Sequence, residues 1–232
     1  MFYGKMKAIT FSFDDGVTQD IKLVELMNKY GLKGTFNLNS ERFGRKGNTY
    51  IARNGVIVKR DIIDKETVPE LYKGHEVAAH TLTHPILPSL DEAEIIHQVE
   101  QDRLNLSELV GYEVVGMAYP GGGVNNDDRV AEIIKNHTGV KFSRTTTSNA
   151  KFDLQDYLLR FNPTTSYGDF DHVRELADEF FSLKTETPKI FYIWGHSYEM
   201  DEENKWGKLE ELFKYISGRE DVFYGTNKEV LL

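Results

Sequence analysis

The sequence predicts an α/β fold in which parallel strands close into a barrel. Short apolar runs typical of buried strands alternate with segments of helical spacing along the whole chain. Polar residues able to carry out chemistry follow the ends of four of these runs. A closed barrel brings such ends together around one mouth, whereas an open sheet spreads them along a crevice. We therefore expect one barrel domain over residues 1–232.

The composition narrows the class of protein. Hydrophobic residues make up 40% of the 232 residues, which suits one large α/β domain. The formal net charge of -9 argues against a nucleic-acid partner, which would need a basic face. The chain has no cysteine, so disulfides and cysteine metal sites are excluded. We find no apolar stretch long enough for a signal peptide or membrane span, and expect a cytoplasmic protein without a membrane partner.

The chain begins with a strand–helix–strand unit. Residues 7–13 form a predicted buried strand, and residues 21–30 have the apolar spacing of a helix. Gly31 is a usual signal for the end of a helix, and residues 34–38 form the second predicted strand. This order and spacing indicate a parallel βαβ unit.

Residues 40–68 interrupt the alternation. Asn54 and Gly55 lie between two β-forming runs, which predicts an inserted β-hairpin near residues 49–59. A helix is expected near residues 65–73. The charges of the insertion are expected to be solvated. A second interpretation makes the hairpin a rim of the substrate groove.

The remaining elements continue the alternation. Residues 74–79 are a predicted strand, and Ser89 with Glu92 has the pattern of a capping box that would open a helix over residues 90–110. Further strands are expected at residues 113–119, 140–144, 157–161, 190–194 and 222–224. Further helices are expected at residues 126–136, 172–183 and 209–216.

Five residues at the predicted strand ends have the chemistry of a metal-dependent hydrolase. Asp14 and Asp15 are adjacent carboxylates, each of which raises the pKa of the other unless a cation or a proton relieves the repulsion. Asp15, His80 and His84 would supply three ligands and leave a position for a water nucleophile, whose pKa the cation would lower. Asp14 would then act as general base and His196 as general acid.

The turn over residues 119–123 adds donors for developing negative charge. It consists of Tyr119, Pro120 and three glycines, and we expect its backbone N–H groups, Gly121 first, to bind an oxyanion. Tyr119 is expected to form part of the substrate-binding wall. Each of these motifs alone is more often structural, since Asp pairs cap helices and paired histidines are common. Their joint order at strand ends favours the catalytic interpretation.

These motifs resemble those of the polysaccharide deacetylases, carbohydrate esterase family 4. The resemblance rests on residues 12–16 (Ser-Phe-Asp-Asp-Gly), on residues 74–85 and on the Gly-His pair at 195–196. It implies a distorted (β/α)7 barrel and hydrolysis of an acetyl group from a sugar. It further implies one divalent metal, usually zinc, on Asp15, His80 and His84, with Asp14 as base and His196 as acid.

The chain departs from the family pattern at two places. The family has an Arg, which pairs with the catalytic base, at the position of Ala118, and an aromatic residue at the position of Gly121. We expect Arg160 to replace that Arg. The family also has an Asp-x-x-Asp-Trp element, whose Asp orients the acid histidine, and this chain has no clear match to it. Glu199 is the candidate that would orient His196 instead.

Three functions are consistent with these residues. The first is a metal-dependent deacetylase that removes N- or O-linked acetyl groups from an oligo- or polysaccharide, so that the expected partner is an acetylated oligosaccharide. The second is an amidohydrolase that acts on a small non-sugar amide or imide. The third is a non-catalytic carbohydrate-binding relative. By ligand type, cobalt, nickel or manganese would suit the site as well as zinc. The sugar, the linkage and the oligomeric state are left open.

Overall fold

The computed structural model describes residues 1–52 and 54–232, and its main sheet consists of parallel strands. The strands follow the order β7-β6-β5-β2-β1-β9-β8, and β10 pairs with β1 outside this path. Their bounds are β1 Lys7–Asp14, β2 Gly34–Leu38, β5 Glu76–Ala79, β6 Gly116–Ala118, β7 Phe142–Arg144, β8 Thr165–Ser166, β9 Lys189–Gly195 and β10 Val222–Tyr224.

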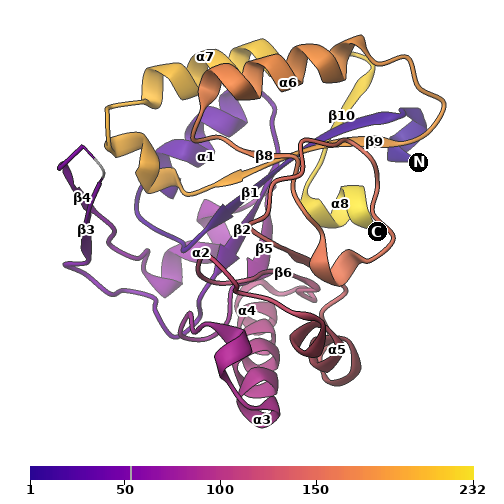
Figure 1. The fold of residues 1–232 in the computed structure, drawn as a ribbon. Helices are drawn as coiled ribbons and strands as arrows, with labels where there is room; N and C mark the ends of the chain where they lie inside the picture. Colours follow the sequence, from indigo (N-terminus) through magenta and orange to yellow (C-terminus); the bar gives the residue numbers. More distant parts are fainter. Residues whose placement is uncertain (53) are drawn as a thin grey trace.

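Helices cover the sheet from two sides. The helices α1, α6 and α7 lie on one side, and α4 and α5 lie on the opposite side (Figure 1). Between α3 and α4, residues 97–101 continue the helix as a π-helical turn. The helix bounds are α1 Asp20–Lys29, α2 Val68–Leu71, α3 Glu92–Ile96, α4 Asp102–Val110, α5 Asp128–His137, α6 Phe170–Ser182, α7 Trp206–Ile216 and α8 Asn227–Leu231.

Strand β1 lies at the centre of the sheet and is buried over its whole length. Its aromatic and β-branched residues suit a strand that is covered on both faces. On one edge it pairs first with β10 and then with β2, and on the other edge with β9. This register places Asp14, its last residue, beside Asn37 of β2.

Residues 161–167, which include the outer strand β8, connect the two sides of the sheet and close the distorted barrel. Phe161 donates its N–H to the carbonyl of Ser143 in β7 at 2.9 Å. Three residues later, Thr164 donates its N–H to Tyr192 of β9, also at 2.9 Å. One short segment therefore pairs with both β7 and β9, and the predicted barrel class is confirmed.

The predicted hairpin is present as an antiparallel pair, β3 Thr49–Ile51 and β4 Ile57–Lys59. It projects from the barrel at the edge of the molecule opposite the two chain ends (Figure 1). Arg53, between these strands, lies outside the described residues. Tyr50 and Val58 face each other across the pair and pack with Tyr198, so the hairpin is anchored to the loop that follows β9.

Two predicted details are wrong. Residues 157–161 do not form a strand, because Leu158–Arg160 is a 3-10 turn and the strand at this place is β8, which follows it. The helix expected from residue 90 begins at Glu92. Its N-cap is Asp91, whose carboxylate accepts the Glu94 N–H at 2.9 Å. The hydroxyl of Ser89 instead donates to the carbonyl of Ile86, so the expected capping box is absent.

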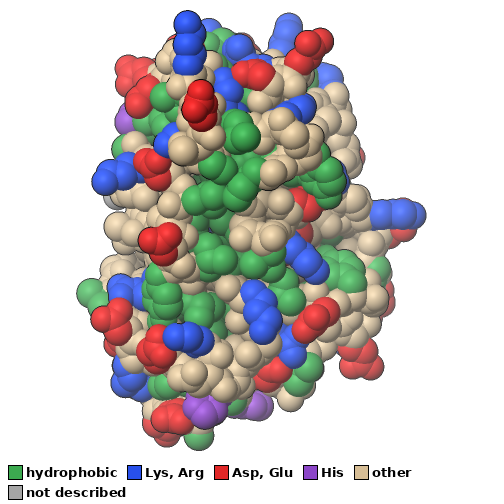
Figure 2. Space-filling model, turned by 90° about the vertical axis from the view of Figure 1, so that its right-hand side faces the viewer, with side chains coloured by type: hydrophobic (Ala, Val, Ile, Leu, Met, Phe, Trp, Pro, Cys, Tyr) green, Lys and Arg blue, Asp and Glu red, His purple; other side chains and the backbone are tan. Residues whose placement is uncertain are grey.

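The barrel core is aromatic around β1. The rings of Phe11, Phe13 and Phe36 are almost fully buried, and Phe13 stacks on Phe36 with ring centroids 5.6 Å apart. The face near the two chain ends carries hydrophobic side chains among charged ones (Figure 2). Among the described helices, none is long and apolar enough to span a bilayer.

Candidate active site

The five predicted site residues meet at the carboxyl ends of neighbouring strands. Asp14 ends β1 and Asp15 follows it, His80 follows β5, and His196 follows β9. His84 lies in the turn after His80. The backbone of Asp15 and that of His84 both have positive φ, at 79° and 70°. Such angles are unfavourable for residues other than glycine, and strain of this kind is typical of functional sites.

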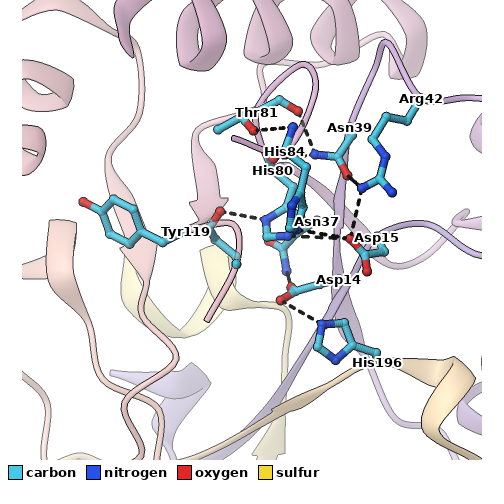
Figure 3. Close-up of polar contacts among 12 residues, drawn as sticks. Asp14, Asp15, Asn37, Asn39, Arg42, His80, Thr81, His84, Tyr119 and His196 are labelled. Carbon is cyan, nitrogen blue, oxygen red and sulfur yellow. Dashed lines mark hydrogen bonds and ion pairs between the residues drawn. The ribbon is translucent and has the colours of Figure 1, made fainter. Parts of the chain in front are cut away.

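Asp15, His80 and His84 form a compact group of ligand atoms. One atom from each residue lies within 4.8 Å of the others. Oδ1 of Asp15 is 3.5 Å from Nε2 of His84 and 3.9 Å from Nε2 of His80 (Figure 3). The three residues that the sequence predicts as metal ligands therefore lie close together in the structure.

Hydrogen bonds fix the ring of His80. Its Nδ1 lies 2.8 Å from the carbonyl of Ala118, so Nδ1 carries the proton and Nε2 is free to bind a cation. The backbone N–H of His80 donates to the carboxylate of Asp102 at 3.0 Å. The side-chain amide of Asn39 donates to the carbonyl of Thr81 at 2.8 Å, which holds the turn that leads to His84.

The chemistry of this group fits a divalent cation. Burial lowers the pKa of His80 to about 4 and also lowers that of His84, so both imidazoles are neutral ligands at pH 7. Oδ1 of Asp15 is buried and has no hydrogen-bond partner among the described residues. A buried carboxylate oxygen without a donor is costly, and a cation would satisfy it.

Asp14 lies beside this group and is held as a carboxylate. Asn37 donates its side-chain amide to Oδ1 at 2.8 Å, and Arg144 donates to Oδ2. Burial alone would raise the pKa of Asp14, but Arg144 and the nearby histidines hold it below its ordinary value of 3.8. Both members of the pair are almost fully buried, with 1% of the Arg144 side chain and 2% of the Asp14 side chain exposed.

His196 faces Asp14 across the pocket, and Glu199 orients it. Nε2 of His196 is 3.9 Å from Oδ2 of Asp14, and its Nδ1 is 2.7 Å from Oε1 of Glu199. Burial alone would lower the pKa of His196, but the hydrogen bond to Glu199 and the charge of that residue raise it to about 9. The hydroxyl of Tyr167 donates to the carbonyl of His196 and holds its backbone. Glu199, the residue expected to orient His196, is therefore in contact with it.

Comparison with known proteins identifies the family. The model of the polysaccharide deacetylase family matches residues 3–142, more than half of the chain. The chain belongs to the polysaccharide deacetylase family.

Individual relatives agree with the family match. The chain is 28% identical over 130 residues to the peptidoglycan-N-acetylglucosamine deacetylase PgdA of Listeria monocytogenes, covering 55% of this chain and 24% of that protein. It is 29% identical over 101 residues to a chitin deacetylase from Pestalotiopsis, covering 43% of this chain and 29% of that protein. The chain thus matches only about a quarter of the length of these relatives.

A solved structure supports the fold. A Mycobacterium smegmatis protein named for the same family has a TM-score of 0.68 and 14% identity, covering 98% of this chain and 90% of that one. At this identity the likeness concerns the fold alone.

The partner of Asp14 is not the arginine predicted from the sequence. The side chain of Arg160 instead donates hydrogen bonds to the side chains of Asn126 and Asp128. Arg160 ends a 3-10 turn, and its side chain is partly exposed to solvent. Arg144 ends β7, and β7 pairs with β6 so that Arg144 lies opposite Ala118. Ala118 is where the family motif places its arginine. The guanidinium is therefore supplied from the neighbouring strand at the same level of the sheet.

The turn after β6 is arranged differently from the prediction. The Tyr119 ring points away from the site, and its hydroxyl donates to the carbonyl of Leu159 in the core (Figure 3). Its backbone N–H donates to the carbonyl of Arg144 at 3.0 Å, so Tyr119 is not a wall of the pocket and its N–H cannot bind an oxyanion. Gly121 does line the pocket, and no acceptor for its N–H is found among the described residues.

The site opens into a pocket of about 260 Å³. Besides the five predicted residues, it is lined by Arg60 from the hairpin and by Trp194 and Tyr198 from the end of β9 and its loop. Arg60, Arg144 and Tyr198 belong to no motif that the sequence shows. A signal existed for Arg144, because it ends a strand that was predicted.

Proposed function

We propose that the protein is a metal-dependent deacetylase that hydrolyses acetyl groups from an acetylated oligo- or polysaccharide. One observation carries this proposal. The three candidate metal ligands line the same pocket as the acid–base pair of Asp14 and His196. Among those ligands, Oδ1 of Asp15 is buried without a hydrogen bond from the described residues. A binding module would have no use for an ionised base and a protonated acid that face each other.

Asp14 is the proposed general base. A divalent cation bound by Asp15, His80 and His84 would polarise the acetyl carbonyl and make water a stronger nucleophile. Asp14 accepts a proton from the attacking water as the water oxygen bonds to the acetyl carbon. Arg144 and Asn37 keep this carboxylate ionised and fixed in orientation. The N–H of Gly121 is the candidate donor to the carbonyl oxygen as it becomes negative.

His196 is the proposed general acid. It donates the proton on Nε2 to the nitrogen or oxygen of the sugar as the bond to the acetyl carbon breaks, and acetate is released. A pKa raised to about 9 keeps His196 protonated at neutral pH, as this step requires. Glu199 compensates the positive charge and aims the ring at the leaving group.

The names of the relatives favour an N-acetylated aminosugar as substrate, because they describe deacetylases of peptidoglycan N-acetylglucosamine and of chitin. Zinc is the proposed metal, since two imidazoles and one carboxylate suit it. A cytoplasmic location stays a prediction.

The decisive experiment measures acetate release by zinc-loaded protein from acetylated chito-oligosaccharides and acetylated xylo-oligosaccharides. We expect release that is lost in Asp14→Asn and retained in Asp128→Asn. Asp128 is a matched control because its side chain is 92% exposed, forms an ion pair with Arg160 and does not line the pocket. No release from protein shown to hold zinc would refute the oligosaccharide deacetylase and favour a small-amide hydrolase. Protein that binds sugar but no metal would favour a carbohydrate-binding relative.

A further inference from the structure

The inserted hairpin places a cation in the wall of the pocket. Arg60 directly follows β4, and it lines the same pocket as Asp14, His80 and His196. Its backbone N–H donates to the carbonyl of Asn48 at 2.8 Å, which ties the residue to the base of the hairpin. The insertion is therefore more than surface decoration, because it contributes a side chain to the site.

Two tyrosines hold the guanidinium group of Arg60. Its Cζ lies 5.1 Å from the ring centroid of Tyr50 and 5.2 Å from that of Tyr198. These two rings are 5.4 Å apart and nearly perpendicular to each other. Tyr198 also stacks on the ring of His196 at 4.9 Å, so Arg60 is linked to the proposed general acid through one side chain. Cation–π contacts of this kind favour a fixed arginine.

The charge of Arg60 has no carboxylate partner in the part of the chain that the structure describes. At the mouth, Arg144 contacts Asp14, Arg42 is 3.5 Å from Asp15, and His196 contacts Glu199. Among the described residues, no carboxylate lies within 4.0 Å of Arg60. Its Nε is also buried without a hydrogen-bond partner among those residues. A guanidinium that lines the pocket without a carboxylate partner is available to bind an acceptor from outside the chain.

We propose that Arg60 binds a carboxylate carried by the substrate, so that the preferred substrate is an acetylated sugar with an acidic substituent. This inference rests on the proposed deacetylase function and adds the substrate class. A guanidinium presents a planar set of donors that matches a carboxylate, whereas a neutral sugar offers only single hydroxyls. The carboxylate can come from a lactyl ether, as in N-acetylmuramic acid, or from a uronic acid next to the acetylated sugar.

The test compares three substrates with the zinc-loaded full chain: N-acetylglucosamine oligomers, N-acetylmuramic acid oligomers and acetylated glucuronoxylan fragments. We expect one acidic substrate to have the highest kcat/KM, which identifies the source of the carboxylate. Arg60→Gln should lower that value by about 10- to 100-fold, mainly through KM, because a hydrogen bond to a charged group is lost. Turnover of the neutral oligomers should fall by a clearly smaller factor, because they carry no carboxylate for Arg60 to bind.

Lys59→Gln is the matched control, because Lys59 is the exposed last residue of β4, directly precedes Arg60 and does not line the pocket. It should leave all three substrates unchanged. Arg60→Lys should recover only part of the loss, since it keeps the charge without the planar donors. Equal losses on acidic and neutral substrates in Arg60→Gln, or no preference for an acidic substrate in the wild type, would overturn the inference.

A binding measurement separates this inference from the proposed function. Calorimetry would compare each acidic sugar with its methyl ester, in wild-type protein and in Arg60→Gln. Tighter binding of the free acid that depends on Arg60 supports the inference even if no acetate is released, in which case only the deacetylase proposal fails. Equal binding of acid and ester would refute the role of Arg60 whatever the activity.

Discussion

The pocket has two sides, an acid–base side with Asp14 and His196 and a ligand side with the candidate metal ligands Asp15, His80 and His84. They differ in how many of their polar atoms have hydrogen-bond partners in the protein. On the acid–base side, both oxygens of Asp14 accept hydrogen bonds, and His196 has Glu199 as a partner. On the ligand side, Oδ1 of Asp15 has no hydrogen-bond partner among the described residues and only Arg42, at 3.5 Å, as an ion-pair neighbour, and burial keeps His80 neutral. The first side is organised by the chain alone. The second leaves a buried carboxylate oxygen without a hydrogen bond, which a bound cation would satisfy.

The largest expected effect separates the two sides by metal affinity. His80→Ala removes a metal ligand and should weaken zinc binding by at least about 100-fold. Loss of a residue that only hydrogen-bonds to a metal ligand usually costs about 10- to 100-fold, and loss of the ligand itself should cost more. Asp14→Asn should keep zinc affinity within a few-fold, although both variants lose acetate release. Zinc titration by calorimetry measures this difference. If Asp14→Asn lost zinc as completely as His80→Ala, the division into two sides would be wrong.

A smaller effect concerns the buried pair on the acid–base side. Arg144→Met leaves the Asp14 carboxylate buried without its cation, which should lower the free energy of unfolding by about 3–5 kcal/mol at pH 7. Arg160→Gln breaks a partly exposed pair and should cost at most about 1 kcal/mol. Urea unfolding of both variants measures the contrast.

The loss in Arg144→Met should depend on pH. Without Arg144, burial raises the pKa of Asp14, and the carboxyl becomes neutral as the pH falls. The cost of the substitution should therefore be smaller at acidic pH than at pH 7. A cost that does not change with pH would show that lost packing, and not the charge of Asp14, accounts for it.

The smallest expected effect is a shift in a pH profile. Glu199→Gln removes the carboxylate that raises the pKa of His196, so that pKa should fall from about 9 toward its ordinary value of 6.5. Because the general acid must be protonated, the alkaline limb of kcat/KM should move to lower pH. An unchanged limb would mean that another group is the acid.

The stability of the folded protein should also depend on pH through the protonation of His196. The pKa of His196 is higher in the folded protein than its ordinary value, so its protonation favours the folded state. This contribution is complete below pH 6.5 and is lost as the pH rises through about 9. Thermal unfolding of metal-free Glu199→Gln should show a weaker decline over this range than the wild type.

Much of the fold and most of the site could be predicted from the sequence. Strands with strong apolar patterns, such as β1 and β9, were placed within one or two residues, and the polar residues after them meet as expected. The resemblance named Asp14, Asp15 and the three histidines, and the structure brings all five together.

The errors have local physical reasons. Residues 157–161 are rich in β-forming side chains, but a 3-10 turn forms there and only Phe161 pairs with β7. The expectation for Arg160 depended on that strand, so the wrong element led to the wrong arginine. The sequence could not reveal that Arg144 stands opposite Ala118, because register between β6 and β7 depends on how the whole sheet is assembled.

The central position of β1 has a consequence for how the chain folds. Its first residue, Lys7, pairs with Lys189 of β9 and with Val222 of β10. During synthesis, the strand that carries Asp14 and Asp15 leaves the ribosome well before these neighbours. Pairings this distant in sequence are slow to form and leave an unpaired apolar edge in the meantime. The strand that carries the two aspartates of the site is therefore completed on one edge only when the last part of the chain has formed.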